Sequence, residues 1–305
     1  MRREGRSKFA DVSVIVAAYQ AADTIGRALA SIAAQTVKPR EVVVVDDGST
    51  DGTREATEAC APNMQGIRLK VFSTEENRGA GAARNRAIAE STQPVLAFLD
   101  ADDEWLPAKI ERSLAVFDEG SHVLVAHDYL TGDGEWERHH HCERRFLEGS
   151  DPFVQLYRKG YIATSSVVAR RDAVIAAGGF NEELRNAQDF ELWLMMLRKP
   201  GTPFKVFGEA LLRYHPTPGG ITSHTWRRLR CGLIIAMGHF PDLRRRPGSP
   251  YVSLWYRVVA LHLEAVRTFG ARGEIVILLL TAAVLPFRLA AATIRCLVGV
   301  ASVRD

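Results

Sequence analysis

Acidic side chains gather directly after an apolar run in the first third of the chain. The run Val95–Leu99 is followed by Asp100, Asp102 and Asp103. Ligands of open α/β sheets bind beyond the carboxyl ends of the strands. Carboxylate oxygens suit Mg²⁺ or Mn²⁺, which also bridge phosphate oxygens. The pattern therefore indicates a divalent-metal and phosphate site, and the alternative is a solvated turn that caps a helix.

Two further polar segments have the composition of nucleotide contacts. Asp47 follows a second apolar run, 41–45, at a place where a carboxylate can accept hydrogen bonds from a base or a ribose. Clusters of Asp, Gly, Ser and Thr also form plain turns, which is the alternative here. Segment 77–86 contains Arg84 and two glycines, a composition that suits a diphosphate. Its GxGxxR spacing is not the GxGxxG fingerprint of dinucleotide folds.

A fourth segment, RNAQDFELW, covers residues 185–193. Asp189 precedes a run whose apolar residues share one helical face. As a structural residue it would cap the helix or favour its dipole. As a catalytic residue it would be a general base.

The stretch Arg138–Glu143 contains three consecutive histidines, a cysteine and a glutamate. Neighbouring residues of a strand point to opposite faces, so these side chains do not easily converge on one ion. We expect a solvated or acceptor-facing segment, with metal binding as the less favoured alternative.

Strand and helix patterns alternate through the first hundred residues and predict the frame that holds these segments. Buried strands are predicted at 12–18, 41–45, 69–72 and 95–99, and helices at 22–34, 53–60 and 80–90. This alternation implies βαβ units and a mainly parallel sheet. Later predictions are a hairpin across 122–141, a strand at 165–169, and helices at 172–177, 190–197, 226–238, 251–269 and 274–300.

Charge divides the 305 residues into two regions. The net charge of +3 is too small to indicate a nucleic-acid binder. Residues 1–224 carry a net charge of −5, whereas residues 225–305 carry +8 and every basic side chain there is arginine. We therefore predict a catalytic domain over 1–224 and an Arg-rich helical region over 225–305.

The Arg-rich region favours a surface over a membrane span. Its uncharged run, 275–287, is shorter than the about 20 residues of a spanning helix, and Arg288 and Arg295 follow it. Such helices suit the face of an anionic membrane, and the alternatives are packing on the catalytic domain or a homo-oligomer. The four cysteines match no disulfide or zinc spacing, and the N-terminus lacks an apolar signal core. A cytoplasmic protein, or one peripheral on the inner face of the membrane, is expected.

The order of the motifs is more specific than any one of them. Within residues 11–220, VSVIVAAYQAAD, VVVVDDGSTDGT, ENRGAGAARNRA, FLDADDEW and GGFNEELRNAQDFELW follow one another. This series resembles the family 2 glycosyltransferases, inverting enzymes that use nucleotide-diphosphate sugars. The resemblance implies an α/β fold of the Rossmann-like GT-A type, with a mainly parallel mixed sheet flanked by helices, and here a C-terminal helical extension.

The resemblance also implies roles for individual residues. The residues implied to bind the nucleotide sugar are Ala17, Tyr19, Asp47, Arg84 and Asp100. Metal ligation falls to Asp102 and His215, with Asp103 in support, and Asp189 becomes the catalytic base. Two motifs depart from the family pattern. Gln188 stands where the family has Glu, and Arg213 precedes Tyr214, which shifts the register before His215.

The implied reaction is transfer of a sugar, with inversion, from a nucleotide-diphosphate donor to an acceptor hydroxyl, assisted by Mg²⁺ or Mn²⁺. The expected partners are that donor and a saccharide or lipid-linked acceptor, in surface polysaccharide or glycolipid synthesis, and no nucleic acid. One alternative is a nucleotidyltransferase acting on sugar phosphates, although the first strand lacks its signature loop. Another is a non-catalytic module that binds nucleotide sugars.

Overall fold

The computed structural model describes residues 8–132, 137–147, 149, 151–160, 162–216 and 224–298. The chain forms two compact units. Unit 1 comprises Met1–Arg144, Ile162–Glu182 and Gly201–Thr217, and unit 2 comprises Arg145–Tyr161, Glu183–Pro200 and Pro218–Asp305. Unit 2 thus holds the Arg-rich region together with two earlier segments, one of which carries Asp189.

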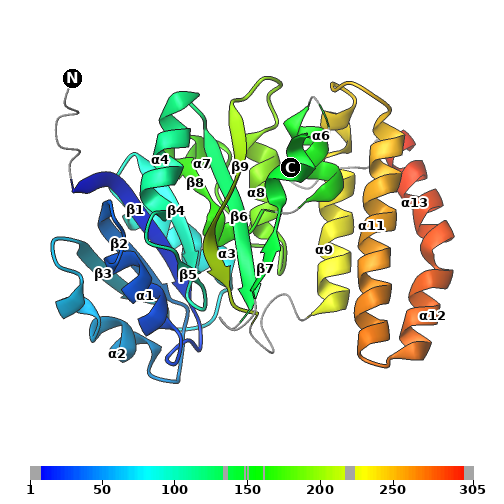
Figure 1. Ribbon diagram of the computed structural model, residues 1–305. Coiled ribbons are helices and arrows are strands. Elements are labelled where there is room, and N and C mark those ends of the chain that lie inside the picture. The colour runs from blue at the N-terminus through cyan, green and yellow to red at the C-terminus, as the bar shows by residue number, and fades with distance from the viewer. Residues whose placement is uncertain are drawn as a thin grey trace. The chain divides into compact units, whose positions relative to one another are not determined.

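The first half of unit 1 is a parallel sheet with connecting helices (Figure 1). Its strands are β1 (Phe9–Ala18), β2 (Lys38–Asp46), β3 (Arg68–Ser73) and β4 (Val95–Asp100), and its helices are α1 (Ile25–Ala33), α2 (Thr53–Glu58) and α3 (Ala80–Glu90). β1 pairs in parallel with β2 and β4, and β2 pairs in parallel with β3. The continuous apolar runs of β1, β2 and β4 are buried, as expected for strands of a parallel sheet. The four strands and three helices predicted here are confirmed.

The second half of unit 1 makes the sheet mixed. It adds β5 (Glu104–Trp105), β6 (Leu124–Gly132), β7 (Glu137–His140), β8 (Val168–Arg170) and β9 (Phe204–Tyr214). The strand order is β3-β2-β1-β4-β8-β6-β9-β5, and β7 pairs with β6. The helical segments of this half are η2 (Thr164–Ser166), α4 (Lys109–Glu119) and α7 (Arg171–Ala176), and α5 (Cys142–Leu147) follows β7 at the boundary of the unit. A further short helix, η1 (Ala61–Asn63), precedes β3 in the first half. The predicted hairpin strands are present, and the residues between them lie outside the described residues.

Strand β9 was not predicted, because its sequence FKVFGEALLRY does not alternate regularly between apolar and polar residues. Its pairing with β6 shifts register twice, around Asp128. Such irregularities break the two-residue period on which strand prediction depends.

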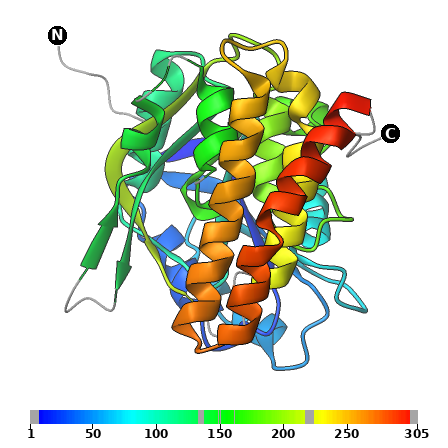
Figure 2. The same cartoon turned by 90° about the vertical axis from the view of Figure 1, so that its right-hand side faces the viewer.

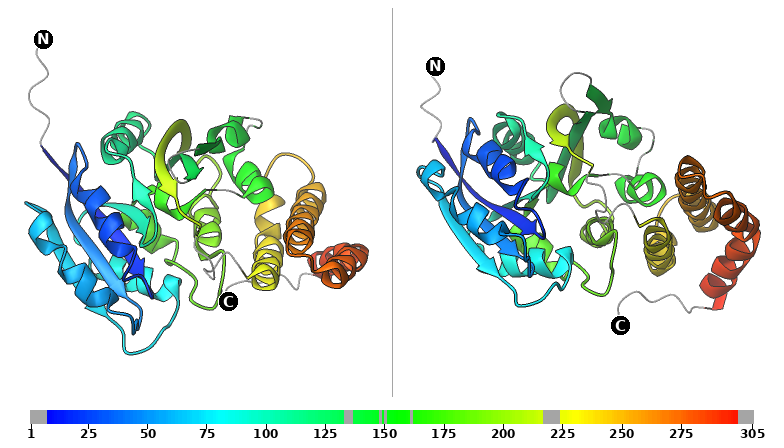
Figure 3. Two further views of the ribbon diagram at one scale, coloured as in Figure 1. Left: turned by 60° about the horizontal axis from the view of Figure 1, so that its bottom comes forward. Right: turned by 90° about the horizontal axis from the view of Figure 1, so that it is seen from below.

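Unit 2 is helical. Its helices are α6 (Pro152–Lys159), α8 (Gln188–Met196), α9 (Thr225–Gly238), α10 (Phe240–Leu243), α11 (Pro250–Ala271), α12 (Ile275–Ala283) and α13 (Leu285–Val298). α11 lies between α9 and the α12–α13 pair (Figure 3), and α11, α12 and α13 run side by side at the front of Figure 2. The helix predicted over 274–300 is two helices, which break at Val284, just before Pro286.

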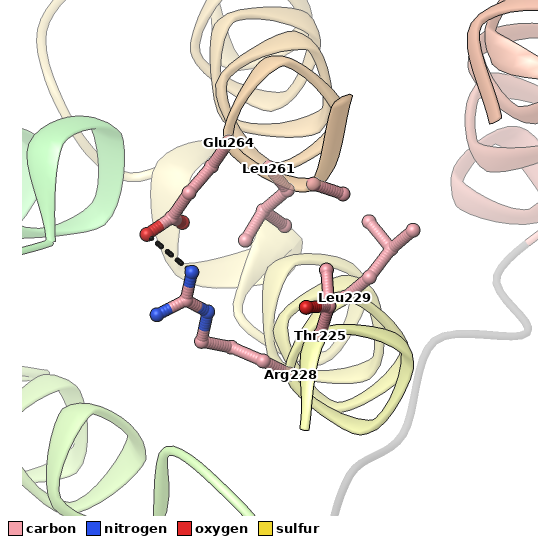
Figure 4. A pocket seen from close by; sticks show the side chains of 6 residues that line it. Thr225, Arg228, Leu229, Leu261 and Glu264 are labelled. Atoms are coloured by element: carbon pink, nitrogen blue, oxygen red, sulfur yellow. Dashed lines mark ion pairs between the residues drawn. The ribbon is translucent and has the colours of Figure 1, made fainter. Parts of the chain in front are cut away.

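A small hollow between α9 and α11 is filled by side chains of the helices themselves (Figure 4). Leu229 and Leu261 pack there, and Arg228 forms an ion pair with Glu264 at 2.8 Å. The hollow has no room for a molecule the size of water. It is therefore a packing feature of unit 2.

Helices α12 and α13 are the apolar helices whose length could bear on a membrane span. Among the described residues, no single helix has the length and hydropathy to cross a bilayer. The pair α12 and α13, bent by 41° at the break between them, has that length and hydropathy when taken together.

A buried carboxylate ties three strands of unit 1 together. Glu41, at 1% exposure, accepts a hydrogen bond from the Ser13 hydroxyl at 2.6 Å and pairs with the Lys70 ammonium at 2.9 Å. The Thr92 backbone N–H also donates to it. Burial by itself would raise the pKa of Glu41, but these donors outweigh it and lower the pKa to about 2.

We expect Glu41→Gln to lower the free energy of unfolding by about 3 kcal/mol at pH 7. Because folding lowers this pKa, the stabilisation is present above the unfolded pKa of 4.5 and is lost as the pH falls towards 2. Chemical denaturation at pH 7, 5 and 3 should therefore show the two proteins converging in acid. Glu58→Gln, which removes an exposed pair with Arg54, is the control and should change stability by less than about 1 kcal/mol. A loss that does not vary with pH would contradict the assignment.

Candidate active site

The parallel register of unit 1 brings three polar segments to one edge of the sheet. Ala17 lies opposite both Val45 and Asp100, and Ala18 lies opposite Asp46. The carboxyl ends of β1, β2 and β4 therefore meet, which is where open α/β sheets bind ligands. The predicted contacts Ala17, Tyr19, Asp47 and Asp100 all belong to this edge.

Asp47 is buried and holds the loop that follows β3. Its carboxylate accepts hydrogen bonds from the backbone N–H of Gly79 at 2.6 Å, the backbone N–H of Arg78 at 3.0 Å and the Thr74 hydroxyl at 3.2 Å. Both carboxylate oxygens are thus used within the protein. Asp47 positions the start of α3, in addition to the base contact predicted for it.

The loops after β1 and β2 are joined beside Tyr19. Gln20 has a φ of +49°, its backbone N–H donates to the Ser49 hydroxyl at 2.9 Å, and its side-chain oxygen accepts from the Thr50 N–H at 2.8 Å. A positive φ outside glycine is uncommon and is found at functional sites. Tyr19 itself is 53% exposed, so its side chain is available to a ligand.

Arg84 and Asp100 form an ion pair at this edge. Arg84 projects from α3, is 8% exposed, and donates to Asp100 Oδ1 at 2.5 Å. Its guanidinium also lies 5.3 Å from the ring centre of Phe180. Packing and pairing fix the orientation of the guanidinium, so a cation is held ready beside the acidic segment.

Asp103 connects three elements beneath the acidic segment. Its carboxylate is fully buried and accepts the Ser165 hydroxyl at 2.5 Å and the His215 backbone N–H at 3.0 Å. Burial, and then the charges of Asp100 and Asp102, raise the pKa of Asp103 well above its usual range. Asp103 thus holds the acidic segment against η2 and β9, which agrees with the supporting role expected for it.

His215 lies beside the acidic segment. β9 pairs with β5, which follows the carboxylates, and this brings His215 Nε2 within 3.7 Å of Glu104 Oε2. Burial and the nearby Arg27 lower the pKa of His215. Arg27 also donates to the Asp102 backbone carbonyl at 2.6 Å. The shifted register therefore does not separate His215 from Asp102, while the metal role of both residues stays a prediction.

Asp189 belongs to unit 2, in the first turn of α8. It follows Ala187, whose φ of +58° is unusual outside glycine. The side-chain amide of buried Gln188 donates to the Leu184 carbonyl at 2.5 Å. An ionised Glu cannot donate this hydrogen bond, so the contact with Leu184 explains why an amide stands at position 188. The catalytic role of Asp189 stays a prediction.

Several residues shape this edge through contacts that no sequence pattern indicated. Ser165 supports Asp103, and Arg27 holds the backbone of Asp102. Arg213 pairs with Glu137 at 2.7 Å and with Glu104 at 3.8 Å. Ser165 and Arg27 belong to no motif of the sequence, and Arg213 was noted only for the shifted register before His215, so only the folded chain identifies these contacts.

We expect Arg84→Lys to weaken donor binding about tenfold or more, because a lysine cannot reproduce the paired, oriented guanidinium. The measurement is titration of a nucleotide-sugar donor against the variant. Arg86→Lys is a matched control on the same helix, since Arg86 is exposed and pairs with Glu90. Equal affinity in the two variants would remove Arg84 from the site.

Taken together, the mixed α/β sheet flanked by helices, with carboxylates, an arginine and a histidine at one strand edge, is the arrangement expected of the GT-A fold. Residues 13–178 match the family model described as Glycosyl transferase family 2. The chain belongs to this family. The succinoglycan biosynthesis protein ExoU of Rhizobium meliloti is 36% identical over 207 residues, which cover 64% of this chain and 59% of ExoU.

Two solved structures share the fold. TarS 1–349 of S. aureus, in complex with UDP-GlcNAc, has a TM-score of 0.64 at 21% identity, over 83% of this chain and 72% of that chain. The mannosyltransferase PcManGT of Pyrobaculum calidifontis, in complex with GDP-Man and Mn²⁺, has a TM-score of 0.60 at 23% identity, over 94% and 87%. The predicted fold class is thereby confirmed.

Proposed function

We propose that this chain is an inverting glycosyltransferase that moves a sugar from a nucleotide-diphosphate donor to an acceptor hydroxyl. The observation that carries the proposal is the single edge of unit 1 where Tyr19, Arg84, Asp100 and the segment around Asp102 meet. This edge offers an exposed ring for a base and a fixed cation for a diphosphate. Membership of the family excludes the nucleotidyltransferase alternative.

The donor set at this edge fits a divalent cation. Asp102 and His215 offer a carboxylate oxygen and an imidazole nitrogen, and Asp103 holds the His215 backbone N–H and the Ser165 hydroxyl beside them. A bound Mg²⁺ or Mn²⁺ would neutralise charge on the diphosphate leaving group. The presence of Mn²⁺ and GDP-Man in the mannosyltransferase of the same fold supports this assignment.

The remaining chemistry falls to side chains of the protein. Arg84 would stabilise the negative charge that develops on the diphosphate. Asp189 would accept the proton of the acceptor hydroxyl while its oxygen attacks the anomeric carbon. The bond to the nucleoside diphosphate breaks on the opposite side, so one displacement inverts the anomeric centre.

We place the reaction in surface polysaccharide or glycolipid synthesis, because ExoU acts in succinoglycan biosynthesis. The test is release of nucleoside diphosphate from a panel of UDP-, GDP- and dTDP-sugars, with and without saccharide or lipid-linked acceptors. Acceptor-dependent release supports the proposal. Donor binding without release under any condition would instead indicate a non-catalytic binding module.

The second part of the proposal concerns α12 and α13. Apolar side chains repeat along one side of each helix and are at least 57% exposed: Ile275, Val276, Leu279, Leu280, Phe287, Ile294, Leu297 and Val298. We call this set the α12–α13 apolar surface. Exposed Arg272 and Arg295 flank it. Apolar side chains with neighbouring arginines suit the interface of an anionic membrane, so we propose peripheral membrane contact here.

A cytoplasmic location at the inner face of the membrane completes the proposal. All four cysteines, Cys60, Cys142, Cys231 and Cys296, are free thiols. Free thiols are typical of reducing compartments, and this supports the location.

We expect the double variant Val276→Asp/Phe287→Asp to reduce binding to phosphatidylglycerol-containing vesicles at least about tenfold, because burying each apolar side chain contributes about 1.5–3 kcal/mol. Co-sedimentation of the full chain measures this. Ile175→Asp on α7, which also changes an exposed apolar residue, is the control. Unchanged binding by the double variant would refute membrane contact. A dimer in light scattering that the same double variant abolishes would assign the surface to a homo-oligomer instead.

A further inference from the structure

Two histidines and an aspartate converge on one side of the β6–β7 hairpin in unit 1. Leu130 pairs with His139 and Tyr129 with His140 in this antiparallel ladder, so one further position places Asp128 opposite His141. Asp128 Oδ2 lies 3.0 Å from His139 Nε2 and 3.4 Å from His141 Nδ1. One ligand atom from each residue lies within 4.8 Å of the others.

This convergence differs from the expectation for residues 138–143. Neighbouring residues do point apart, since His140 stacks on Tyr129 with ring centres 4.5 Å apart, on the other side of the ladder. His139 and His141 are two positions apart, however, and therefore share a face. The third ligand, Asp128, comes from the preceding strand β6 and lies outside the segment 138–143.

The carboxylate at the centre of the cluster is already oriented. Asp128 has a side chain only 1% exposed, and its second oxygen accepts the Glu143 backbone N–H at 2.9 Å. A hydrogen bond of this kind fixes a ligating carboxylate and is typical of metal sites. The histidine side chains are 36% and 40% exposed, so an ion has a path from solvent and room for a water ligand.

The two distances from the Asp128 carboxylate oxygen to the histidine nitrogens suit a tetrahedral ion. Zinc bonds to nitrogen and oxygen of about 2.0–2.1 Å place neighbouring ligand atoms about 3.3 Å apart. The two distances from Asp128, 3.0 and 3.4 Å, lie on either side of this value. Imidazole is a good ligand for Zn²⁺, whereas Mg²⁺ prefers oxygen ligands alone.

We propose that Asp128, His139 and His141 form a second metal site, which binds Zn²⁺ with its fourth position open to water. The site shares no residue with the proposed Asp102–His215 site, so it does not depend on the proposed glycosyl transfer. Zn²⁺ here would fasten the end of β7 to β6. It would thereby stabilise the strand that carries Glu137, the partner of Arg213 on β9.

The experiment measures Zn²⁺ binding to the full chain by competition with a chromophoric chelator, in an Asp102→Asn background that removes the carboxylate of the proposed Asp102–His215 site. One Zn²⁺ per chain is expected. Because loss of an outer partner alone costs about 10–100-fold in affinity, His139→Ala or His141→Ala should each weaken binding by about 10²-fold or more. Co²⁺ absorption should report tetrahedral nitrogen and oxygen ligands in the parent and lose that signature in both variants.

His140→Phe is the matched control, because it keeps a ring to stack on Tyr129 and changes the histidine that faces the other side. It should retain the Zn²⁺ affinity of the parent. Equal affinity in His139→Ala and the parent would overturn the proposal, and so would an equal loss in His140→Phe. Circular dichroism of each variant excludes unfolding as the cause of lost binding.

Discussion

Asp189→Asn is expected to reduce sugar transfer by at least about 10²-fold while donor binding is preserved. The amide cannot accept the proton of the acceptor hydroxyl, and general-base assistance is typically worth about 10²–10⁴-fold. The substitution keeps the size of a residue in the first turn of α8. The measurements are the rate of nucleoside diphosphate release with acceptor and the rise in Tm that the donor produces.

Two comparisons make this result specific. Asp118→Asn, at an exposed position on α4, makes the same chemical change outside the site and should leave the rate unaltered. Hydrolysis of the donor without acceptor should fall less in Asp189→Asn than transfer does. Transfer at the rate of the unsubstituted chain in Asp189→Asn would refute the base assignment and leave the donor site untouched.

Asp102→Asn is the second large effect that we expect. The variant should transfer sugar about 10²–10³-fold more slowly, because a lost ligand removes electrostatic stabilisation of the leaving diphosphate. It should also lose the dependence of donor affinity on Mg²⁺ or Mn²⁺. The measurement is donor titration with and without the ion, alongside the transfer rate.

Removal of the ion tests the same assignment without a substitution. A chelator should lower transfer by the unsubstituted chain to the level of Asp102→Asn, and added Mn²⁺ or Mg²⁺ should restore it. Transfer that is insensitive to the chelator would contradict metal assistance. Asp118→Asn again serves as the control, since it removes a carboxylate that lies apart from the acidic segment.

The first hundred residues were predictable because their signals are local. An apolar run such as 41–45 is buried on both faces of a parallel sheet, and polar residues follow it wherever the strand ends. The edge proposed to bind the donor follows from this order, since parallel strands bring their carboxyl ends together. The sequence therefore sufficed to expect Asp47 and Asp100 at the ends of their strands, while the donor contacts assigned to Tyr19 and Arg84 came from the family resemblance and stay predictions.

The second half of unit 1 was not predictable in the same way. β9 lacks a regular alternation, and its place beside β6 depends on pairing across more than 70 residues. β5 has only two residues, too few for a pattern. The helix α4 was also missed. These elements bring His215 and Arg213 to the acidic segment. The surroundings of the proposed Asp102–His215 site could therefore not be predicted from the sequence.

By itself, the sequence determined the family, the parallel half of the sheet and the residues expected to bind the donor, because ordered motifs and local periodicity carry that information. Tertiary structure decided which of these side chains also hold the protein together, such as Asp47 on its loop and Asp103 beneath the acidic segment. It alone brought Asp128 to His139 and His141. Hydrogen bonds and cross-strand pairs join residues far apart in the chain, and no pattern within a single segment records such a contact.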